Sequence, residues 1–181
     1  MSNIALITGG NRGLGFATAR ALARAGNTTI IASRDESRAR DAAEQLIAEG
    51  LDAERLVLDV TSSSSVADAA KRVRERHEHL DILINNAGIL PEATDSVEHE
   101  FADPAMFQQT FDTNVVGAVT VIEAFLPLLR GSEAGRIVNV SSTMGSLVER
   151  ANPDSPYYAM VVPAYQSSKA ALNSITIGLS K

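Results

Sequence analysis

TGGNRGLG, residues 8–15, joins the apolar run NIALIT at 3–8 to the helical stretch GLGFATARALARAG at 13–26. Its glycines at 9, 13 and 15 allow a tight backbone turn and a close approach to a ligand. The following helix presents free N–H groups and the positive end of its dipole, which suit a pyrophosphate. The glycine spacing is one residue longer than the usual dinucleotide fingerprint, so a plain glycine turn is the alternative. The strand before and the helix after favour dinucleotide binding.

The rest of the chain continues the same alternation of strand and helix. Strands are expected at 28–33, 54–60, 80–86 and 135–142, and helices at 36–50, 64–79, about 105–130 and 163–181. A looser polar connection covers about 87–104. Strict alternation with short connections predicts right-handed crossovers and a parallel sheet covered on both faces. We therefore expect residues 1–181 to form a single α/β dinucleotide-binding and catalytic domain.

Composition excludes several classes of function. The net charge is −6 and charges of both signs are mixed along the chain, which argues against nucleic-acid binding. The absence of cysteine excludes disulfides and thiolate metal sites, and the histidines at 77, 79 and 99 lack metal-ligand spacing, so no metal is expected. The N-terminus does not resemble a signal peptide, and the apolar stretch 115–129 contains Glu123 and is too short for a membrane span. We expect a soluble cytoplasmic protein with no membrane partner.

The end of the second strand should contact the adenosine ribose of a dinucleotide. The sequence there is ASRD, with Ser33 at the strand end and Arg34 directly after it. A guanidinium can hold a 2′-phosphate bidentately, and Arg12 in the glycine loop can add a second positive charge. The pair favours NADP(H) over NAD(H). Asp35 opposes this interpretation if a shift of one residue brings its carboxylate to the ribose, and Arg34 as a solvated loop residue is a further alternative.

Six ordered motifs give the chain its family resemblance: TGGNRGLG, LDV at 58–60, NNAG at 85–88, NVVG at 114–117, IVNVSS at 137–142 and YQSSK at 165–169. In this order they resemble the short-chain dehydrogenase/reductases, and SRD after the second strand is most similar to the NADPH-dependent, carbonyl-reductase-like members. The resemblance implies a doubly wound Rossmann fold with strand order 3-2-1-4-5. Complete members add strands 6 and 7. Because this chain stops inside the helix that carries Tyr165, we expect those strands to be absent and the chain to be truncated at its C-terminus.

The resemblance also implies the site residues. The catalytic tetrad would be Asn114, Ser142, Tyr165 and Lys169. Asn114 would kink the long helix and anchor a water that passes protons to Lys169, Ser142 would bind the substrate oxygen, and Lys169 would also hold the nicotinamide ribose. Ser142 is preferred to Ser141 because the family uses the second serine of the pair, and Ser141 is then a plain strand-end hydroxyl. Besides Tyr165 and Lys169, the cofactor-binding residues would be Gly9, Asn11, Arg12, Gly13, Leu14, Gly15, Ser33, Arg34, Asp59, Val60, Asn86, Ala87 and Gly88.

The spacing of tyrosine and lysine independently favours Tyr165. Residues four apart on a helix share a face, and Tyr165 has Lys169 at that distance. Tyr157 and Tyr158 have valines there instead. A nearby ammonium stabilises phenolate and lowers a phenol pKa from its ordinary value of about 10. Tyr165 is therefore the expected general acid and base, although a Tyr-x-x-x-Lys alone also fits core packing.

One departure from the family pattern lies before Tyr165. The segment MGSLVERANPDSPYYAMVVPA, residues 144–164, carries an insertion of about ten residues relative to the family's shorter spacing, and Pro153, Pro156 and Pro163 oppose regular helix there. Tyr157 and Tyr158 in this insertion are interpreted either as substrate contacts or as packing of the loop.

These observations predict an oxidoreductase that transfers a hydride between NADP(H) and a small carbonyl or alcohol substrate. The alternatives are a non-catalytic nucleotide-binding or regulatory protein of the same fold, and an epimerase or dehydratase of the same family. The family resemblance suggests a homodimer or homotetramer formed through the helices at 105–130 and 163–181.

Overall fold

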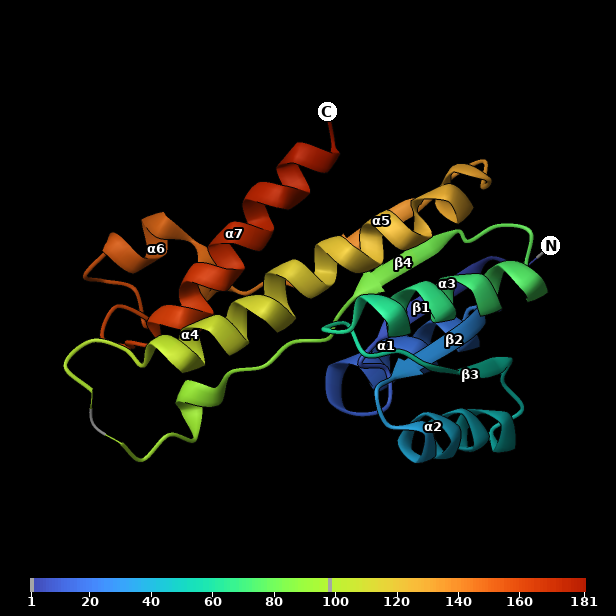
Figure 1. Ribbon diagram of the computed structural model, residues 1–181, viewed down its shortest axis with the longest axis horizontal. Coiled ribbons are helices and arrows are strands. Elements are labelled where there is room, and N and C mark those ends of the chain that lie inside the picture. The colour runs from blue at the N-terminus through green and yellow to red at the C-terminus, as the bar shows by residue number, and fades with distance from the viewer. Residues whose placement is uncertain (1, 98) are drawn as a thin grey trace. The chain divides into compact units, whose positions relative to one another are not determined.

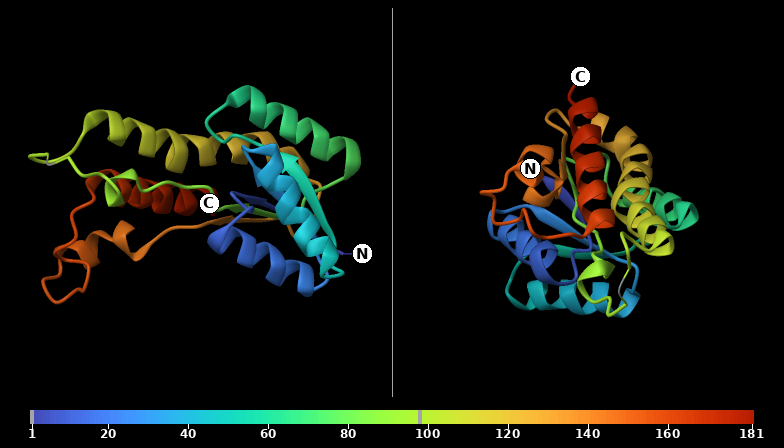
Figure 2. Two further views of the ribbon diagram at one scale, coloured as in Figure 1. Left: turned by 90° about the horizontal axis from the view of Figure 1, so that it is seen from below. Right: turned by 90° about the vertical axis from the view of Figure 1, so that its left-hand side faces the viewer.

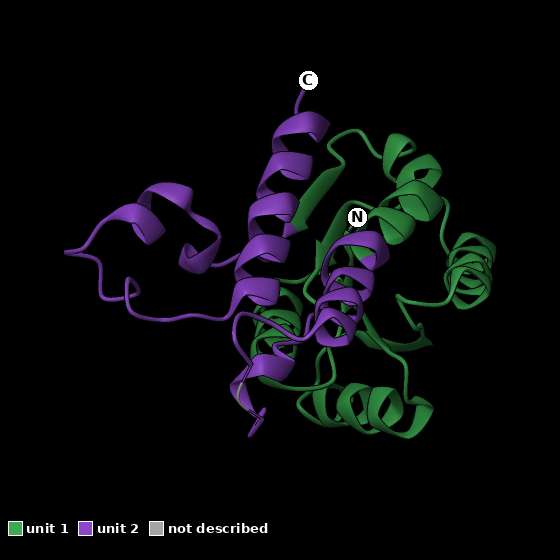
Figure 3. Cartoon of the chain, turned by 60° about the vertical axis from the view of Figure 1, so that its left-hand side comes forward, with its two compact units in different colours: residues 1–87, 118–138 green, residues 88–117, 139–181 purple. Residues whose placement is uncertain are grey.

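The computed structural model describes residues 2–97 and 99–181 (Figure 1). The chain forms two compact units, each assembled from two separate segments (Figure 3). Unit 1 comprises Met1–Ala87 and Ala118–Val138, and unit 2 comprises Gly88–Gly117 and Asn139–Lys181. Each unit is described separately below.

Unit 1 is built around a five-stranded sheet. Its strands are β1 (Ile4–Thr8), β2 (Thr28–Ser33), β3 (Ala53–Val57), β4 (Ile82–Asn85) and β5 (Arg136–Asn139), whose last residue belongs to unit 2. Their order is β3-β2-β1-β4-β5, which confirms the predicted order 3-2-1-4-5. β1 pairs in parallel with β2 and with β4, and Leu6 lies opposite Ile30 on one side and Leu83 on the other.

Helices cover both faces of this sheet. α1 (Gly13–Arg24) and α3 (Ser63–Arg76) lie on opposite faces, as Figure 2 shows. The remaining helices of unit 1 are α2 (Glu36–Ala48) and α5 (Gly117–Arg130). Leu6 and Ile30 pack with α3 and α5 in a buried cluster. Because side chains alternate along a strand, Ala5, Ile7 and Ile31 point to the other face. All six residues of β2 are buried, as expected for a central parallel strand.

The third strand ends earlier than predicted. We expected it to reach residue 60, but β3 ends at Val57. Asp59 then forms a turn in which its Oδ1 accepts hydrogen bonds from the Thr61 N–H (3.0 Å) and the Thr61 hydroxyl (2.8 Å). The Asp59 N–H also donates to Ser65 Oγ at 3.0 Å and not to a neighbouring strand, and this side-chain bond to the backbone explains the early end.

Unit 2 holds the elements that the sequence did not predict. They are the 3-10 turns η1 (Pro91–Ala93) and η3 (Thr143–Gly145), the π-helical turn η2 (Asp112–Val116) and the short helix α6 (Leu147–Ala151). The predicted helices correspond to α4 (Pro104–Phe111) and α7 (Pro163–Leu179). α7 begins at Pro163, the predicted start of the helix at 163–181, although Pro163 was also expected to oppose regular helix in the insertion. Proline suits that position because it has no N–H to leave unpaired.

The longest helical stretch runs from Pro104 to Arg130. By length and composition alone it is able to cross a membrane, a test that core helices of soluble proteins also pass. Its α5 section places Val121, Phe125 and Leu128 in the core of unit 1, where they are 0%, 0% and 3% exposed. α5 is therefore a helix of the core of unit 1.

Candidate active site

The glycine loop of unit 1 has a backbone that requires glycine. Gly9 and Gly13 adopt φ angles of 63° and 54°, in the left-handed region. Gly15 has an ordinary φ, but a Cβ there would collide with the side-chain nitrogen of Asn86 and lie 2.5 Å from the Gly9 carbonyl oxygen. The first turn of α1 therefore approaches its neighbours as closely as glycine permits.

Asn86 and Thr8 hold this loop against the end of β4. The Asn86 side-chain nitrogen donates to the carbonyls of Thr8 (3.0 Å) and Gly9 (3.2 Å). The Thr8 hydroxyl in turn accepts from the N–H groups of Asn86 and Ala87, both at 3.0 Å. Asn86 and Ala87 were predicted only as cofactor contacts, so sequence reasoning missed the role of Asn86 and Thr8 in fixing the loop.

The N-terminus of α1 is open to an anion. Arg12 occupies the cap position with extended backbone, makes no side-chain cap hydrogen bond, and is followed by a first turn without acidic residues. Its neighbours Asn11 and Leu14 are partly or largely exposed, Leu14 by 62%. Uncapped N–H groups and the helix dipole favour negative charge at this end. The residues present therefore fit the pyrophosphate of a dinucleotide.

At the end of β2 the structure separates the roles of Arg34 and Asp35. Asp35 caps α2, where its Oδ1 accepts from the Ser37 hydroxyl (2.7 Å) and the Arg38 N–H (3.1 Å). The Ser37 bond, followed by the Arg38 N–H, holds the pKa of Asp35 below its ordinary value. Ser33 is buried and its hydroxyl accepts from the Asp35 N–H, whereas Arg34 is exposed. The carboxylate is thus engaged by the helix, and the guanidinium is available.

The predicted cofactor residues of unit 1 lie at the same end of the sheet. The glycine loop follows β1, Ser33 and Arg34 end β2, Asp59 and Val60 follow β3, and Asn86 and Ala87 follow β4. These are the carboxyl ends of parallel strands, where open α/β sheets bind ligands.

In unit 2, Asn114 lies inside the π-helical turn and is 1% exposed. Its Oδ1 accepts from the Ile89 N–H (2.8 Å), while its Nδ2 donates to the Ile89 carbonyl (3.0 Å) and to Ser168 Oγ (3.0 Å). Both amide hydrogens and the oxygen are therefore engaged. The amide therefore links Ile89, directly after Gly88, to Ser168 of α7 by hydrogen bonds.

Ser168 extends this connection to the tyrosine. Its hydroxyl donates to the Tyr165 carbonyl at 2.7 Å while accepting from Asn114. The side chain is fully buried. Sequence reasoning gave Ser168 no role, because a serine inside YQSSK has no signal beyond its place one residue before Lys169.

Lys169 is buried beside Tyr165. Its Nζ lies 5.6 Å from the centre of the Tyr165 ring and donates to the Val140 carbonyl at 2.7 Å. The residue is 5% exposed, and this burial lowers the pKa of the ammonium. A Cβ added to Gly88 would lie 3.3 Å from Asn114 Oδ1 and 3.7 Å from Lys169 Nζ. Gly88, Asn114, Tyr165 and Lys169 are therefore gathered in one cluster.

The loop that carries the two serines also contacts α7. Ser142 caps η3, and its Oγ accepts from the Met144 N–H (3.2 Å), which leaves the hydroxyl hydrogen to donate elsewhere. The Ser141 hydroxyl lies 3.5 Å from the Lys169 carbonyl. Gly145, the last residue of η3, approaches α7 so closely that an added Cβ would lie 2.8 Å from the Lys169 carbonyl carbon.

The other two tyrosines lie in the turns of the insertion. Tyr157 is half-buried and Tyr158 is 52% exposed. The N–H of Tyr158 donates to the Ser155 carbonyl at 3.0 Å. Both interpretations of these side chains, substrate contact and loop packing, stay open.

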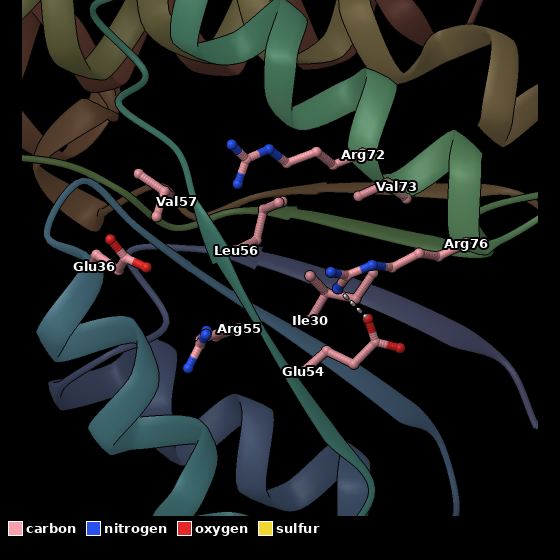
Figure 4. Close-up of a pocket in the computed structure, with 9 residues that line it drawn as sticks. All are labelled: Ile30, Glu36, Glu54, Arg55, Leu56, Val57, Arg72, Val73 and Arg76. Atoms are coloured by element: carbon pink, nitrogen blue, oxygen red, sulfur yellow. Dashed lines mark hydrogen bonds and ion pairs between the residues drawn. The ribbon is translucent and has the colours of Figure 1, made fainter.

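A separate hollow lies along β3, the strand at one edge of the sheet (Figure 4). Charged side chains of both signs line it, and Arg76 pairs with Glu54 at 3.4 Å. Mixed charges along an edge strand are typical of protection against pairing with another chain. None of the predicted site residues line this hollow, so we assign it no ligand.

A glycine loop before a helix, and a tyrosine one helical turn before the buried Lys169, are typical of dinucleotide-binding α/β oxidoreductases. Residues 3–181 match the model of the short chain dehydrogenase family, and the chain belongs to that family. It is 40% identical over 184 residues to the short-chain dehydrogenase anuI of Penicillium roqueforti, a match that covers 96% of this chain and 69% of the relative.

Two solved structures extend the comparison. The RhlG/NADP active-site complex of Pseudomonas aeruginosa is 31% identical with a TM-score of 0.83, and the match covers 98% of this chain and 65% of RhlG. Gluconate 5-dehydrogenase from Burkholderia cenocepacia, in complex with NADP and tartrate, is 29% identical with a TM-score of 0.83, over 99% of this chain and 65% of that one. The chain thus spans about two thirds of the length of these relatives. The fit of a nicotinamide dinucleotide agrees with both complexes.

The close packing of Gly15 predicts that Gly15→Ala weakens cofactor binding. The added methyl displaces Asn86 or Gly9, and we expect NADPH affinity to fall by at least about tenfold, the cost of roughly 1.4 kcal/mol. Fluorescence titration measures this. Gly178→Ala is the control, because space around Gly178 in α7 is open and the variant should bind as the parent does. Equal affinity of both variants would contradict the prediction.

Proposed function

We propose that the protein is an NADP(H)-dependent oxidoreductase that interconverts a carbonyl and an alcohol, with Tyr165 as general acid and base. The observation that carries this proposal is the position of the Lys169 ammonium 5.6 Å from the Tyr165 ring centre, inside the cluster with Asn114. Membership of the short chain dehydrogenase family supports it.

The chemistry divides between cofactor and protein. When bound, the cofactor supplies a hydride to the carbonyl carbon or accepts one from the alcohol carbon. In reduction, the Tyr165 hydroxyl transfers its proton to the carbonyl oxygen, and the Ser142 hydroxyl donates a hydrogen bond to the same oxygen. The Lys169 ammonium stabilises the phenolate that remains. Oxidation of the alcohol uses the same groups in reverse.

Asn114 has a positioning function in this proposal. Its amide holds Ile89 and Ser168, and Ser168 holds the backbone of Tyr165. A water that relays protons to Lys169, as the resemblance implies, would bind elsewhere on the residue, because every amide hydrogen already has an acceptor.

The preference for NADP(H) is supported by the charges at the end of β2. Arg34 and Arg12 are exposed, whereas the competing carboxylate of Asp35 is engaged as the cap of α2. Two related structures contain NADP. We further propose a small-molecule substrate, a cytoplasmic location, and self-association through the helices at 105–130 and 163–181.

Tyr165→Phe tests the proposed function. Loss of the phenol removes proton transfer, so we expect kcat for NADPH-dependent reduction of an aldehyde probe such as 4-nitrobenzaldehyde to fall by about 10²–10⁴-fold. NADPH affinity should stay nearly unchanged. Tyr158→Phe is the control, and a rise in KM there would identify Tyr158 as a substrate contact. Undiminished turnover by Tyr165→Phe would refute the assignment.

Arg34→Ala tests the cofactor preference. A lost charged hydrogen bond to the 2′-phosphate should weaken NADPH binding by about 10–100-fold, corresponding to about 1.5–3 kcal/mol. NADH binding should not change, since NADH lacks that phosphate. Arg40→Ala, which removes another exposed arginine of unit 1, should affect neither cofactor. Equal losses for NADPH and NADH in Arg34→Ala would count against the assignment.

The lowered pKa of Lys169 predicts the alkaline limb of alcohol oxidation. Because burial disfavours the ammonium, Lys169 loses its proton at a lower pH than an ordinary lysine, whose pKa is 10.5. Phenolate loses its stabilising charge at that point, so the rate should fall as pH rises through a midpoint below 10.5. The measurement is kcat against pH, with circular dichroism to verify folding. A kcat for alcohol oxidation that still rises with pH at 10.5 would contradict the prediction.

A further inference from the structure

The helix that carries Tyr165 begins without a cap of its own. Val162 occupies the cap position with an apolar side chain, and Pro163, the first residue of α7, has no N–H. The Gln166 N–H donates to the Val162 carbonyl at 2.9 Å, which is the first intrahelical bond. The N–H groups of Ala164 and Tyr165 therefore need acceptors from another segment.

Glu92 supplies both acceptors. The Ala164 N–H donates to its Oε1 and the Tyr165 N–H donates to its Oε2, each at 2.9 Å. Glu92 belongs to the 3-10 turn η1, and it lies 73 residues before Tyr165 in the sequence. A carboxylate is well suited to this place, because it accepts two charge-assisted hydrogen bonds and lies at the positive end of the helix dipole.

Tyr165 is consequently held at both backbone polar groups by side chains. Glu92 accepts from its N–H, and Ser168 donates to its carbonyl at 2.7 Å. Ser168 is itself fixed by Asn114, as described above. Glu92 thus completes the restraint on the residue from which the phenol projects.

We propose that Glu92 is a positioning residue for the reaction at Tyr165, acting through the backbone of the first turn of α7. The inference rests on the proposed function, since it assigns Glu92 a part in that reaction. Small displacements of a reacting group have large effects on rate: a misplacement of about 1 Å can reduce it by about 10²-fold. Glu92 itself contacts the backbone and is not a proton donor in this scheme.

The alternative is that Glu92 only stabilises the fold. A purely structural role predicts a lower melting temperature with normal turnover in the folded enzyme. A positioning role predicts reduced kcat in folded enzyme, with NADPH binding little changed because most of the proposed cofactor contacts, the glycine loop and Arg34 among them, belong to unit 1. The separation between kcat and cofactor affinity therefore distinguishes the two roles.

The experiment compares Glu92→Ala, Glu92→Gln and the control Glu149→Ala, which truncates an exposed glutamate of α6 in the same unit. We expect Glu92→Ala to lower kcat for 4-nitrobenzaldehyde by about 10–100-fold, with NADPH affinity as in the parent. Glu92→Gln keeps one acceptor oxygen and should recover part of the loss. Glu149→Ala should match the parent in both quantities.

The outcomes separate this inference from the proposed function. If the parent and Glu149→Ala reduce the aldehyde and a folded Glu92→Ala does so equally well, only the role of Glu92 is refuted. If the parent binds NADPH but reduces no carbonyl probe, the proposed function fails and the positioning role fails with it. Should Glu92→Ala not fold, the folded Glu92→Gln decides, because normal kcat in that variant also refutes the proposal.

Discussion

The three hydrogen bonds of the Asn114 amide constrain the geometry of the whole cluster that holds Gly88, Tyr165 and Lys169. The side chain is buried, so each of its polar atoms must find a protein partner or incur a desolvation cost. Oδ1 binds the Ile89 N–H, and Nδ2 binds the Ile89 carbonyl and Ser168. An aspartate lacks the two donors, and a leucine would leave several polar groups unpaired. The π-helical turn is the local backbone arrangement in which the residue makes these bonds.

The fold was predictable because its signal is distributed along the chain. Apolar runs of strand length alternate with amphipathic helical stretches, and the observed β2 at Thr28–Ser33 and the start of α7 at Pro163 coincide with the expected boundaries. Burial on both faces explains why the sequence of β2 is a continuous run of apolar and β-branched residues. The strand order followed from the family resemblance, and the sheet confirms it. The expected third strand was too long because the Asp59 N–H donates to Ser65 Oγ and not to the neighbouring strand.

The cluster in unit 2 was only partly predictable. Tyr165 and Lys169 are four residues apart, so their proximity follows from helix geometry alone. Asn114 and Ser142 came from the resemblance, and Ser168 and Glu92 from neither source. The hydrogen bonds of Glu92 join segments more than 70 residues apart, and no local pattern encodes such a pairing. The one available signal was negative: Val162 and Pro163 leave the helix start without a local acceptor, which indicates that an acceptor exists but not which residue provides it.

The capping bonds of Asp35 have an evolutionary consequence. Position 35 serves the stability of α2, because its carboxylate binds Ser37 and the Arg38 N–H. A substitution there that alters charge near a ribose also removes a helix cap. Residue 34 does not cap α2, since its side chain is exposed and it precedes the cap residue. Under the proposed function, a substitution at residue 34 therefore changes the cofactor preference without loss of a helix cap, while residue 35 is held in place by the fold.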